Sequence, residues 1–352
     1  MKMATGKKVR VGLIGTGWIG QHHGLNVMAN PYAELAAVCD VNSKQANAYL
    51  KESNCQAVVF NNHEELLKQD DIEAIVVASP NASHEEHAVA AAKAGKHVYL
   101  EKPMAITLEG CRCIVRAVEK TKVKFSMGYH RRLNPLVQHA KSLIAEGKLG
   151  ELVFVESDYF HHVPGDLDIW SWLGKNDIAG SMIHAGTGHN IDLLRFFCGE
   201  VAEVSCYKDV VMPRRIQMET EDLAVINLRF NSGALGRVGL FLGPILPFTF
   251  TVRLFGTKGT VDNNRVWLDT IPRFADSGHE EDCIHLPQSW IADNVQGGVS
   301  ETWKQNMNTF IDDIRLDRKP FNGAESGFNT AAVCFAALQS AEEKRSVEPE
   351  VL

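Results

Sequence analysis

Six residues near the start of the chain have the spacing of a phosphate-binding turn. Gly15 to Gly20 form the pattern G-x-G-x-x-G directly after the apolar run 9–14, and a helical stretch follows. Asp40 ends the next apolar run. Glycines at these positions permit a tight turn and let backbone N–H groups approach a pyrophosphate at a helix N-terminus. The context of strand, turn, helix and acidic residue therefore predicts a dinucleotide site.

The position of Asp40 indicates which dinucleotide is bound. A carboxylate there accepts hydrogen bonds from the adenosine ribose and repels a 2′-phosphate, so we expect NAD in preference to NADP. Two alternatives stay open. Asp40 could instead cap the next helix, and Lys44 could accommodate a phosphate.

The elements that position this turn form a series of strands and helices. From residue 9 to about 128, short apolar runs alternate with helix-patterned segments, which predicts a doubly wound parallel sheet. One helix is expected to begin with a capping box, Ser83 and Glu86, and to end at Gly95. We therefore assign residues 1–128 to a dinucleotide-binding Rossmann domain.

The pattern changes after residue 128. A helix is predicted from Asn134-Pro135 to Gly147, followed by longer strands within 151–162, 201–211, 221–230, 233–241 and 248–262. Further helices are expected at about 180–198, 301–316 and 325–342. In the second of these, Trp303, Met307, Phe310, Ile311 and Ile314 recur at helical spacing and predict a buried face. Residues 129–352 thus read as an α+β domain with an open, mainly antiparallel sheet, which we assign to substrate binding and oligomerisation.

The composition limits the partners of the chain. Its 352 residues carry a net charge of −7, with basic residues scattered along the sequence, so nucleic acid is not an expected partner. We find neither a secretory signal nor an apolar run long enough for a membrane span, so we expect a soluble, cytoplasmic protein with no membrane partner. The eight cysteines show no CxxC pair, which favours free thiols.

Two further motifs carry a family resemblance. Ser79-Pro80-Asn81-x-x-His84 and Glu101-Lys102-Pro103 occur with the glycine turn, and Tyr129-His130-Arg131-Arg132 precedes a helix that ends EGKLGEL. Together they resemble the glucose-fructose oxidoreductase, inositol dehydrogenase and rhizopine catabolism protein family (Gfo/Idh/MocA) over nearly the whole chain. The resemblance implies an oxidoreductase of sugars, cyclitols or their derivatives, and a homodimer or homotetramer.

The resemblance also implies a set of residues that line the cofactor. They are Gly15, Thr16, Gly17, Trp18, Ile19, Asp40, Ser79, Pro80, Asn81, His84, Glu101, Lys102, His130 and Trp172. One departure affects Trp172, because Leu173 stands where the family often has an arginine.

Oxidation of a secondary alcohol needs a group that accepts the hydroxyl proton. Lys102 follows a parallel strand at its carboxyl end, where ligands bind in doubly wound folds, and a positive nicotinamide nearby would favour its neutral form. Spacing alone would make it an ordinary strand-end lysine. The resemblance adds a catalytic and substrate-contacting role.

The segment from Gly180 to Asp192 resembles the family helix in which an aspartate lies four residues before a histidine. His189 matches the histidine, but Ala185 stands at the aspartate position and cannot transfer a proton. Residues i and i+4 share a helix face, so Ala185 leaves room beside His189. Our hypothesis is that Lys102 and His189 carry proton transfer, and that His184 or a water takes the vacant role. Alternatively, His184 only packs.

The remaining candidates are aromatic and polar groups that could bind a sugar ring. Tyr159, His161, Asp168 and Trp170 join Lys102, His184 and His189 in the expected substrate site. The alternative is a loop that packs its tryptophans beneath itself.

No metal site is expected. His84 and His87 are three residues apart without an evident third ligand, and His22 and His23 are expected on a helix surface.

The function that fits best is an NAD-dependent dehydrogenase acting on a secondary alcohol or ketone of a sugar, cyclitol or glycoside. Two alternatives are an NAD-dependent glycosidase that retains its cofactor and a catalytically inactive NAD or ligand sensor.

Overall fold

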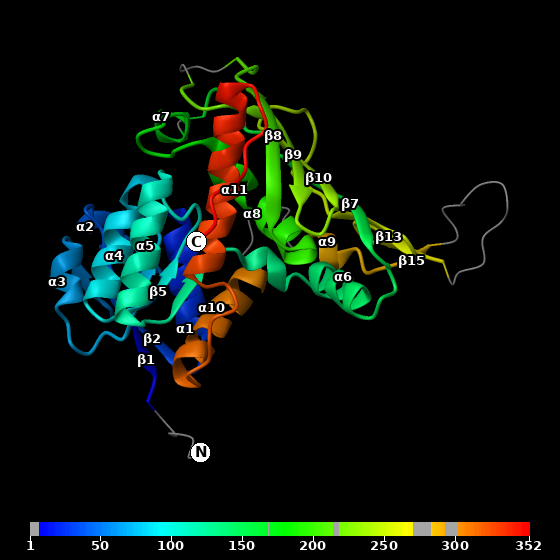
Figure 1. Ribbon diagram of the computed structural model, residues 1–352. Coiled ribbons are helices and arrows are strands. Elements are labelled where there is room, and N and C mark those ends of the chain that lie inside the picture. Colours follow the sequence, from blue (N-terminus) through cyan, green and yellow to red (C-terminus); the bar gives the residue numbers. More distant parts are fainter. Residues whose placement is uncertain (1–6, 168, 214–217, 270–282, 293–300) are drawn as a thin grey trace. The chain divides into compact units, whose positions relative to one another are not determined.

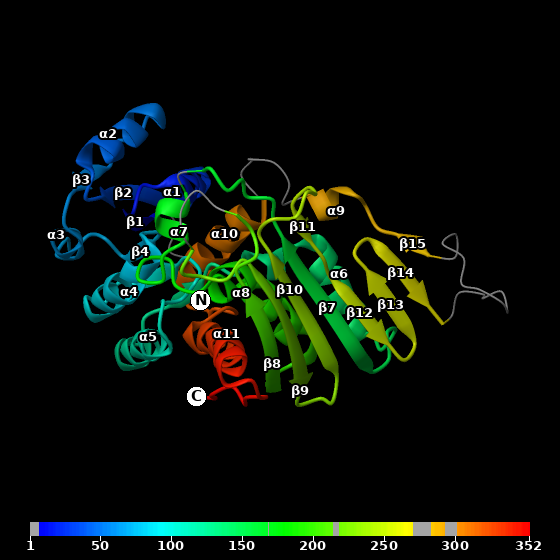
Figure 2. The ribbon, with the colours of Figure 1, turned by 90° about the horizontal axis from the view of Figure 1, so that it is seen from above.

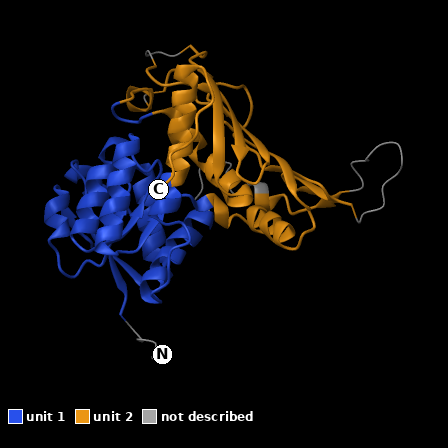
Figure 3. Ribbon diagram, viewed as in Figure 1, with its two compact units in different colours: residues 1–130, 177–180, 301–328 blue, residues 131–176, 181–300, 329–352 orange. Residues whose placement is uncertain are grey.

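The computed structural model describes residues 7–167, 169–213, 218–269, 283–292 and 301–352 (Figure 1). The chain divides into two compact units (Figure 3). The first comprises Met1–His130, Asp177–Gly180 and Glu301–Phe328, and the second comprises Arg131–Asn176, Ser181–Ser300 and Asn329–Leu352.

Six parallel strands form the sheet of the first unit, in the order β3-β2-β1-β4-β5-β6. They are β1 (Val9–Ile14), β2 (Ala33–Cys39), β3 (Val58–Phe60), β4 (Ala74–Val77), β5 (His97–Leu100) and β6 (Phe125–Met127). Every residue of β4 is buried, as expected of a parallel strand with both faces covered. The strand order reverses between β1 and β4, which is where ligands bind in doubly wound sheets. The predicted Rossmann architecture is confirmed.

Helices accompany this sheet along the chain. They are α1 (Trp18–Ala29), α2 (Ser43–Glu52), α3 (His63–Leu67), α4 (His84–Lys93), α5 (Leu108–Thr121) and α10 (Glu301–Arg315), with the 3₁₀ turns η1 (Asn81–Ser83) and η2 (His130–Leu133). Met307, Phe310 and Ile311 of α10 are fully buried, which confirms the predicted apolar face. This face packs into the core beside β1 and β5, and α10 also contacts α1.

The expected capping box at the start of α4 is wrong. Ser83 has helical backbone angles and its side chain makes no capping hydrogen bond. The reason is that η1 leads directly into α4, so that Ser83 donates its N–H to the carbonyl of Pro80 within the turn. The predicted end of the helix is confirmed, because Gly95 has a positive φ of 74°.

One large sheet dominates the second unit, with the strand order β15-β14-β13-β12-β7-β10-β9-β8 (Figure 2). Its strands are β7 (Leu152–Phe160), β8 (Val201–Asp209), β9 (Leu223–Phe230), β10 (Leu235–Phe241), β11 (Thr249–Phe250), β12 (Arg253–Gly256), β13 (Gly259–Asp262), β14 (Arg265–Leu268) and β15 (Ile284–His285). Strand β11 pairs with β7 outside that order. Only the β7–β10 pair is parallel among the described strand pairs of this sheet, so the mainly antiparallel prediction is confirmed.

The single strand predicted over 248–262 is instead three short strands. β12 and β13 form a hairpin, and the two residues between them are Thr257 and Lys258. Gly256 and Gly259 flank this turn. A side chain at Gly256 would lie 2.1 Å from the Leu149 carbonyl oxygen, so the glycine allows the backbone to approach closely.

The helices of the second unit are α6 (Pro135–Ala145), α7 (Trp170–Leu173), α8 (Met182–Cys198), α9 (Ser289–Ala292) and α11 (Ala324–Glu343), whose first turns lie in the first unit. Asn134 caps α6 by accepting a hydrogen bond from the Leu136 N–H, as predicted from the Asn-Pro pair. Helix α8 packs against β7 and β10. None of the helices in the described part of the chain is long and apolar enough to cross a membrane.

Candidate active site

The glycine turn has the geometry of a dinucleotide cradle. Gly15 has a positive φ of 93°, and a Cβ there would lie 2.5 Å from the Ala78 carbonyl oxygen. A Cβ on Gly20 would lie 2.0 Å from the Gly15 carbonyl oxygen. A Cβ on Gly17 would meet nothing within 4 Å, so the space in front of the α1 N-terminus is open. The turn therefore fits a pyrophosphate, for which the helix offers unpaired N–H groups and a positive dipole end.

Asp40 follows β2 and is tied to this turn. Its Oδ2 accepts hydrogen bonds from the Thr16 N–H at 2.8 Å and the Thr16 hydroxyl at 2.7 Å, and its Oδ1 accepts the Asn42 N–H at 2.8 Å. The side chain that caps α2 belongs to Asn42 and not to Asp40. The carboxylate is thus fixed beside the glycine turn, where a ribose hydroxyl would be recognised.

The Ser79–His84 segment leaves β4 at the same edge of the sheet, because Ile14 pairs with Val77. Asn81 Nδ2 donates to the Ala179 carbonyl at 2.8 Å, which ties η1 to residues 177–180 of the same unit. His84 is buried, and its ring nitrogens lie 2.6 Å from the Pro103 carbonyl and 3.0 Å from the Ser79 carbonyl. Burial lowers the pKa of His84 despite these two acceptors. His84 thereby links the loop after β4 to the loop after β5.

Glu101 and Lys102 follow β5, whose Leu100 pairs with Val77. Glu101 is buried, and its Oε1 accepts a 2.7 Å hydrogen bond from His23 Nε2 in α1. Its Oε2 accepts the backbone N–H of Lys102 at 2.9 Å. Burial alone would raise the pKa of Glu101, but His23 and Lys102 outweigh it and hold that pKa below its ordinary value. One ionised carboxylate therefore joins α1 to the backbone of the candidate catalytic lysine.

The expected surface position of His23 is wrong, because its side chain is fully buried. Its partner lies 78 residues away, so no local pattern marks the pair.

His130 is held by contacts with α10. Its Nδ1 forms a 2.7 Å hydrogen bond with the Thr302 hydroxyl, and its ring packs edge-on against Trp303 at 5.5 Å between centroids. Trp303 also contacts Trp18 at 5.6 Å. His130 is therefore held by α10, a contact that the sequence motif did not predict.

Helix α8 carries the candidate residues of the second unit. Ser181 caps it by accepting the Ile183 N–H at 3.1 Å, and His184, Ala185 and His189 are all buried. The His184 ring packs edge-on against Phe335 of α11, with 5.1 Å between centroids, which favours its packing role.

An ion pair anchors the later turns of α8. Asp192 accepts two hydrogen bonds from the Arg132 guanidinium, at 2.7 and 2.6 Å, and its Oδ1 accepts the Thr330 hydroxyl at 3.2 Å. Both charged side chains are buried. Asp192 ends the segment that resembles the family helix, but its arginine partner could not be predicted from the sequence. The pair fixes the helix one turn after His189.

The aromatic candidates divide between core and surface. Trp170 is 1% exposed and donates its indole N–H to the Pro164 carbonyl at 2.8 Å, which matches the packing alternative. Trp172 is 39% exposed. Tyr159 and His161 are partly exposed, and each contacts Phe248, at 5.5 and 5.1 Å between ring centroids. Burial raises the pKa of Tyr159. Asp168 lies outside the described residues.

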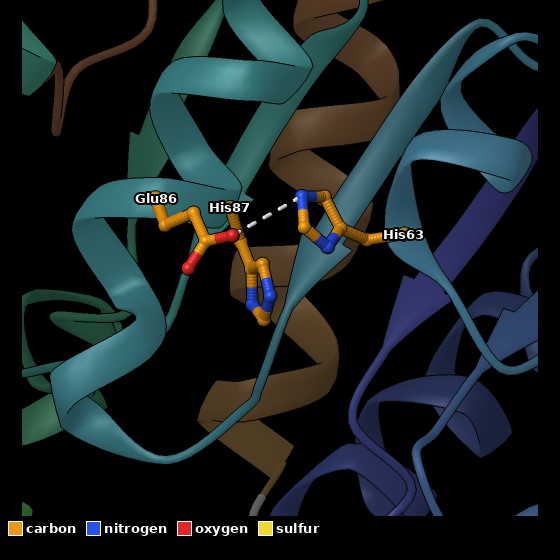
Figure 4. Close-up of side chains that lie close together, drawn as sticks. All are labelled: His63, Glu86 and His87. Carbon is orange, nitrogen blue, oxygen red and sulfur yellow. Dashed lines mark ion pairs between the residues drawn. The ribbon is translucent and has the colours of Figure 1, made fainter.

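A third potential ligand, which the sequence did not make evident, lies near His87. His63 at the start of α3 lies with Glu86 and His87 of α4, and their ligating atoms are all within 4.8 Å of one another (Figure 4). The sequence separates His63 from His87 by 24 positions, and packing of α3 against α4 brings them together.

Comparison with known proteins identifies both parts of the chain. Residues 9–129 match the family model described as "Oxidoreductase family, NAD-binding Rossmann fold", and residues 137–262 match the "GFO/IDH/MocA C-terminal domain". Myo-inositol 2-dehydrogenase of Thermotoga maritima is 27% identical over 346 residues, which cover 97% of this chain and 99% of that protein.

Solved structures show the same relationship. WlbA dehydrogenase from Bordetella pertussis, in complex with NADH and UDP-GlcNAcA, has a TM-score of 0.83 at 26% identity and matches over 99% of both chains. Levoglucosan dehydrogenase, in complex with NADH and levoglucosan, has a TM-score of 0.87 over 97% of this chain and 100% of that chain, and its 23% identity supports the fold alone. This chain therefore belongs to the GFO/IDH/MocA family of oxidoreductases, and its first unit contains the NAD-binding Rossmann fold of that family.

Proposed function

We propose that this protein is an NAD-dependent dehydrogenase that acts on a secondary alcohol of a cyclitol, sugar or glycoside. The observation that carries the proposal is the glycine turn with Asp40 beside it, within a chain that matches both domains of an oxidoreductase family. The named relatives support the substrate class, since one acts on inositol and another binds a nucleotide sugar.

The first unit supplies the groups that hold NAD. The open space at Gly17 and the N-terminus of α1 fit the pyrophosphate, and Asp40 accepts the adenosine ribose hydroxyls. A 2′-phosphate there would meet a fixed negative charge, so NADP should bind more weakly. When bound, NAD supplies the acceptor for the hydride that leaves the alcohol carbon.

Proton transfer is assigned to two residues, each argued within its own unit. Lys102 follows β5 at the edge of the sheet from which the glycine turn and Ser79 also leave, and its backbone is fixed by Glu101. His189 lies on α8, on the same helix face as Ala185. Ala185 itself cannot transfer a proton, so the proposal assigns this role to His189. His184 is left out because it packs on Phe335.

The alternatives of a glycosidase and a sensor find no support among the named relatives, which are dehydrogenases. A net redox assay still separates all three functions. The protein is incubated with NAD or NADP and a panel of inositols, monosaccharides, anhydrosugars and glycosides, and absorbance at 340 nm is followed. A rise that depends on both substrate and NAD supports the dehydrogenase. A flat trace with cleaved glycoside in the same tubes supports the glycosidase.

Variants test the two proton-transfer residues. Lys102→Ala and His189→Ala should each lower kcat by about 10²–10⁴-fold, the usual contribution of a general acid or base. Lys93→Ala is the matched control, because Lys93 is an exposed lysine at the end of α4 in the same unit. Normal turnover in His189→Ala together with its loss in Lys102→Ala would show that the two-residue assignment is wrong.

We also propose that the protein forms a homo-oligomer through the outer face of its large sheet. Tyr207 is 78% exposed and pairs with Val225, and Leu235 pairs with Phe154 on the same face. Exposed apolar residues gathered on one sheet face are typical of protein interfaces. Sedimentation velocity would test this. A monomer at micromolar concentration contradicts it, and Tyr207→Lys should weaken a dimer or tetramer.

The cytoplasmic location stays a prediction.

A further inference from the structure

We propose that His63, Glu86 and His87 form a binding site for one divalent transition-metal ion, with zinc, cobalt, nickel and copper as the expected class. The dehydrogenase function does not require such an ion.

The geometry brings three ligands from two helices to one point. His63 Nε2 lies 3.6 Å from a carboxylate oxygen of Glu86, and the two imidazole rings have centroids 4.5 Å apart. Figure 4 shows the Glu86 carboxylate turned toward the His63 ring, with the His87 ring beside it. All three ligating atoms lie within 4.8 Å of one another. Neighbouring ligands of a tetrahedral ion with bonds of about 2.0–2.1 Å are roughly 3.3 Å apart, so small side-chain rotations would close the site.

The side chains can make these rotations without disturbing the fold. Glu86 is 68% exposed and reaches the histidines from the first turn of α4, so its carboxylate can turn toward an ion. His63 occupies the first position of α3, and the side chain of Asn62 caps that helix independently. The capping contact of α3 therefore does not depend on the His63 side chain.

One of the ligands is already oriented. His87 Nδ1 hydrogen-bonds the Ser79 hydroxyl at 2.9 Å, which leaves its Nε2 as the coordinating atom. Histidine ligands in metal sites commonly use their second ring nitrogen in this way, and the contact fixes the ring orientation. An ion bound to His87 would therefore also restrain Ser79, which lies in the loop after β4.

The ligand set selects the class of ion. Two imidazoles and one carboxylate suit zinc, cobalt, nickel and copper, whereas calcium and magnesium prefer oxygen ligands alone. The helix N-termini here carry partial positive charge, which opposes a cation weakly. Glu64 and Glu65 in the first turn of α3, and Glu85 in that of α4, offset this charge. Three protein ligands leave positions for water, since the cluster is partly exposed.

The test is direct binding of Co²⁺ and Zn²⁺ to tag-free protein, without NAD or substrate. All variants carry Cys283→Ser, because Cys283 Sγ lies 3.3 Å from His285 Nε2 and that pair would also take soft ions. Calorimetry gives stoichiometry and affinity, and the visible absorption of Co²⁺ reports its coordination. His162→Ala is the matched control, since His162 is an exposed histidine outside the cluster.

We expect one ion per chain in the Cys283→Ser background and in the control. His63→Ala and His87→Ala should each weaken binding by at least about 100-fold, more than the 10–100-fold loss of an outer partner. Glu86→Gln should weaken it less. The ion should also raise the Tm of the background protein but not that of the histidine variants. If His63→Ala is unstable, His63→Gln replaces it.

Two results would overturn the proposal. One is unchanged affinity in either histidine variant, and the other is no saturation below about 1 mM free ion. Every readout is made without turnover, so failure here leaves the dehydrogenase proposal untouched, and loss of that proposal leaves this one standing.

Discussion

Replacing His23 tests whether the buried pair with Glu101 holds the candidate catalytic lysine. In the structure His23 donates to Glu101 at 2.7 Å, and both side chains are buried. Removing one partner leaves a buried carboxylate without its main hydrogen-bond donor, which typically costs about 3–5 kcal/mol. Glu101→Gln removes the charge but keeps the shape, so it should cost less, about 1–2 kcal/mol.

Urea unfolding gives these costs, and a double-variant cycle isolates the pair. We expect a coupling free energy of at least about 2 kcal/mol between His23→Ala and Glu101→Gln. His22→Ala is the control, because His22 is the adjacent histidine and packs on Trp18 instead. A loss below about 1 kcal/mol in His23→Ala, equal to the control, would refute the reasoning.

A local readout links the pair to the active site. The backbone N–H of Lys102 donates to Glu101 Oε2 at 2.9 Å, so hydrogen exchange of this amide should quicken in both His23→Ala and Glu101→Gln. The pKa of Glu101 is lower in the folded chain than in the unfolded chain. The unfolded state therefore binds the proton first, and the stabilisation is full above about pH 4.5 and is lost as the pH falls below it. The difference between wild type and Glu101→Gln should shrink over that range.

Four further substitutions have distinct expected outcomes. Gly15→Ala should cost about 2–4 kcal/mol of unfolding free energy, because Gly15 has a positive φ and the Ala78 carbonyl lies across the turn. Gly17→Ala should leave the unfolding free energy unchanged but weaken NAD binding at least tenfold, which calorimetry would measure. Asp40→Ser should lower the ratio of kcat/KM for NAD over NADP by about tenfold or more, and an unchanged ratio would contradict the assigned role. Arg132→Met should cost about 3–5 kcal/mol by leaving Asp192 buried and unpaired, and a neutral effect in thermal unfolding would exclude the pair as an anchor of α8.

What the sequence predicts well depends on patterns within a few residues. The glycine turn, the apolar strands and the core face of α10 each follow from local spacing, and the structure has them where they were predicted. Local spacing also misleads. Ser83 and Glu86 have the sequence of a capping box, yet a 3₁₀ turn occupies the helix start. The run 248–262 is uniformly strand-like, and only its glycines mark the hairpin.

The candidate site is less predictable because its contacts join distant positions. The residues next to His23 in the sequence do not distinguish it from a surface histidine. Its side chain is buried against Glu101, which follows β5 and which the fold brings next to α1. His63 likewise becomes a candidate ligand only when α3 packs on α4. Arg132 appeared as part of a motif, but its function as the partner of Asp192 could not be read from either position alone.

The Glu101 carboxylate is a common anchor for two cofactor-binding elements of the first unit. One oxygen holds α1, whose N-terminus faces the predicted pyrophosphate site, and the other holds the backbone of Lys102. Movement of α1 would therefore be transmitted to the lysine through a single buried group. The backbone of Lys102 is therefore held by the same carboxylate that holds α1. His23, which has no assigned part in proton transfer, is therefore expected to change both the stability of the protein and the exchange of the Lys102 amide.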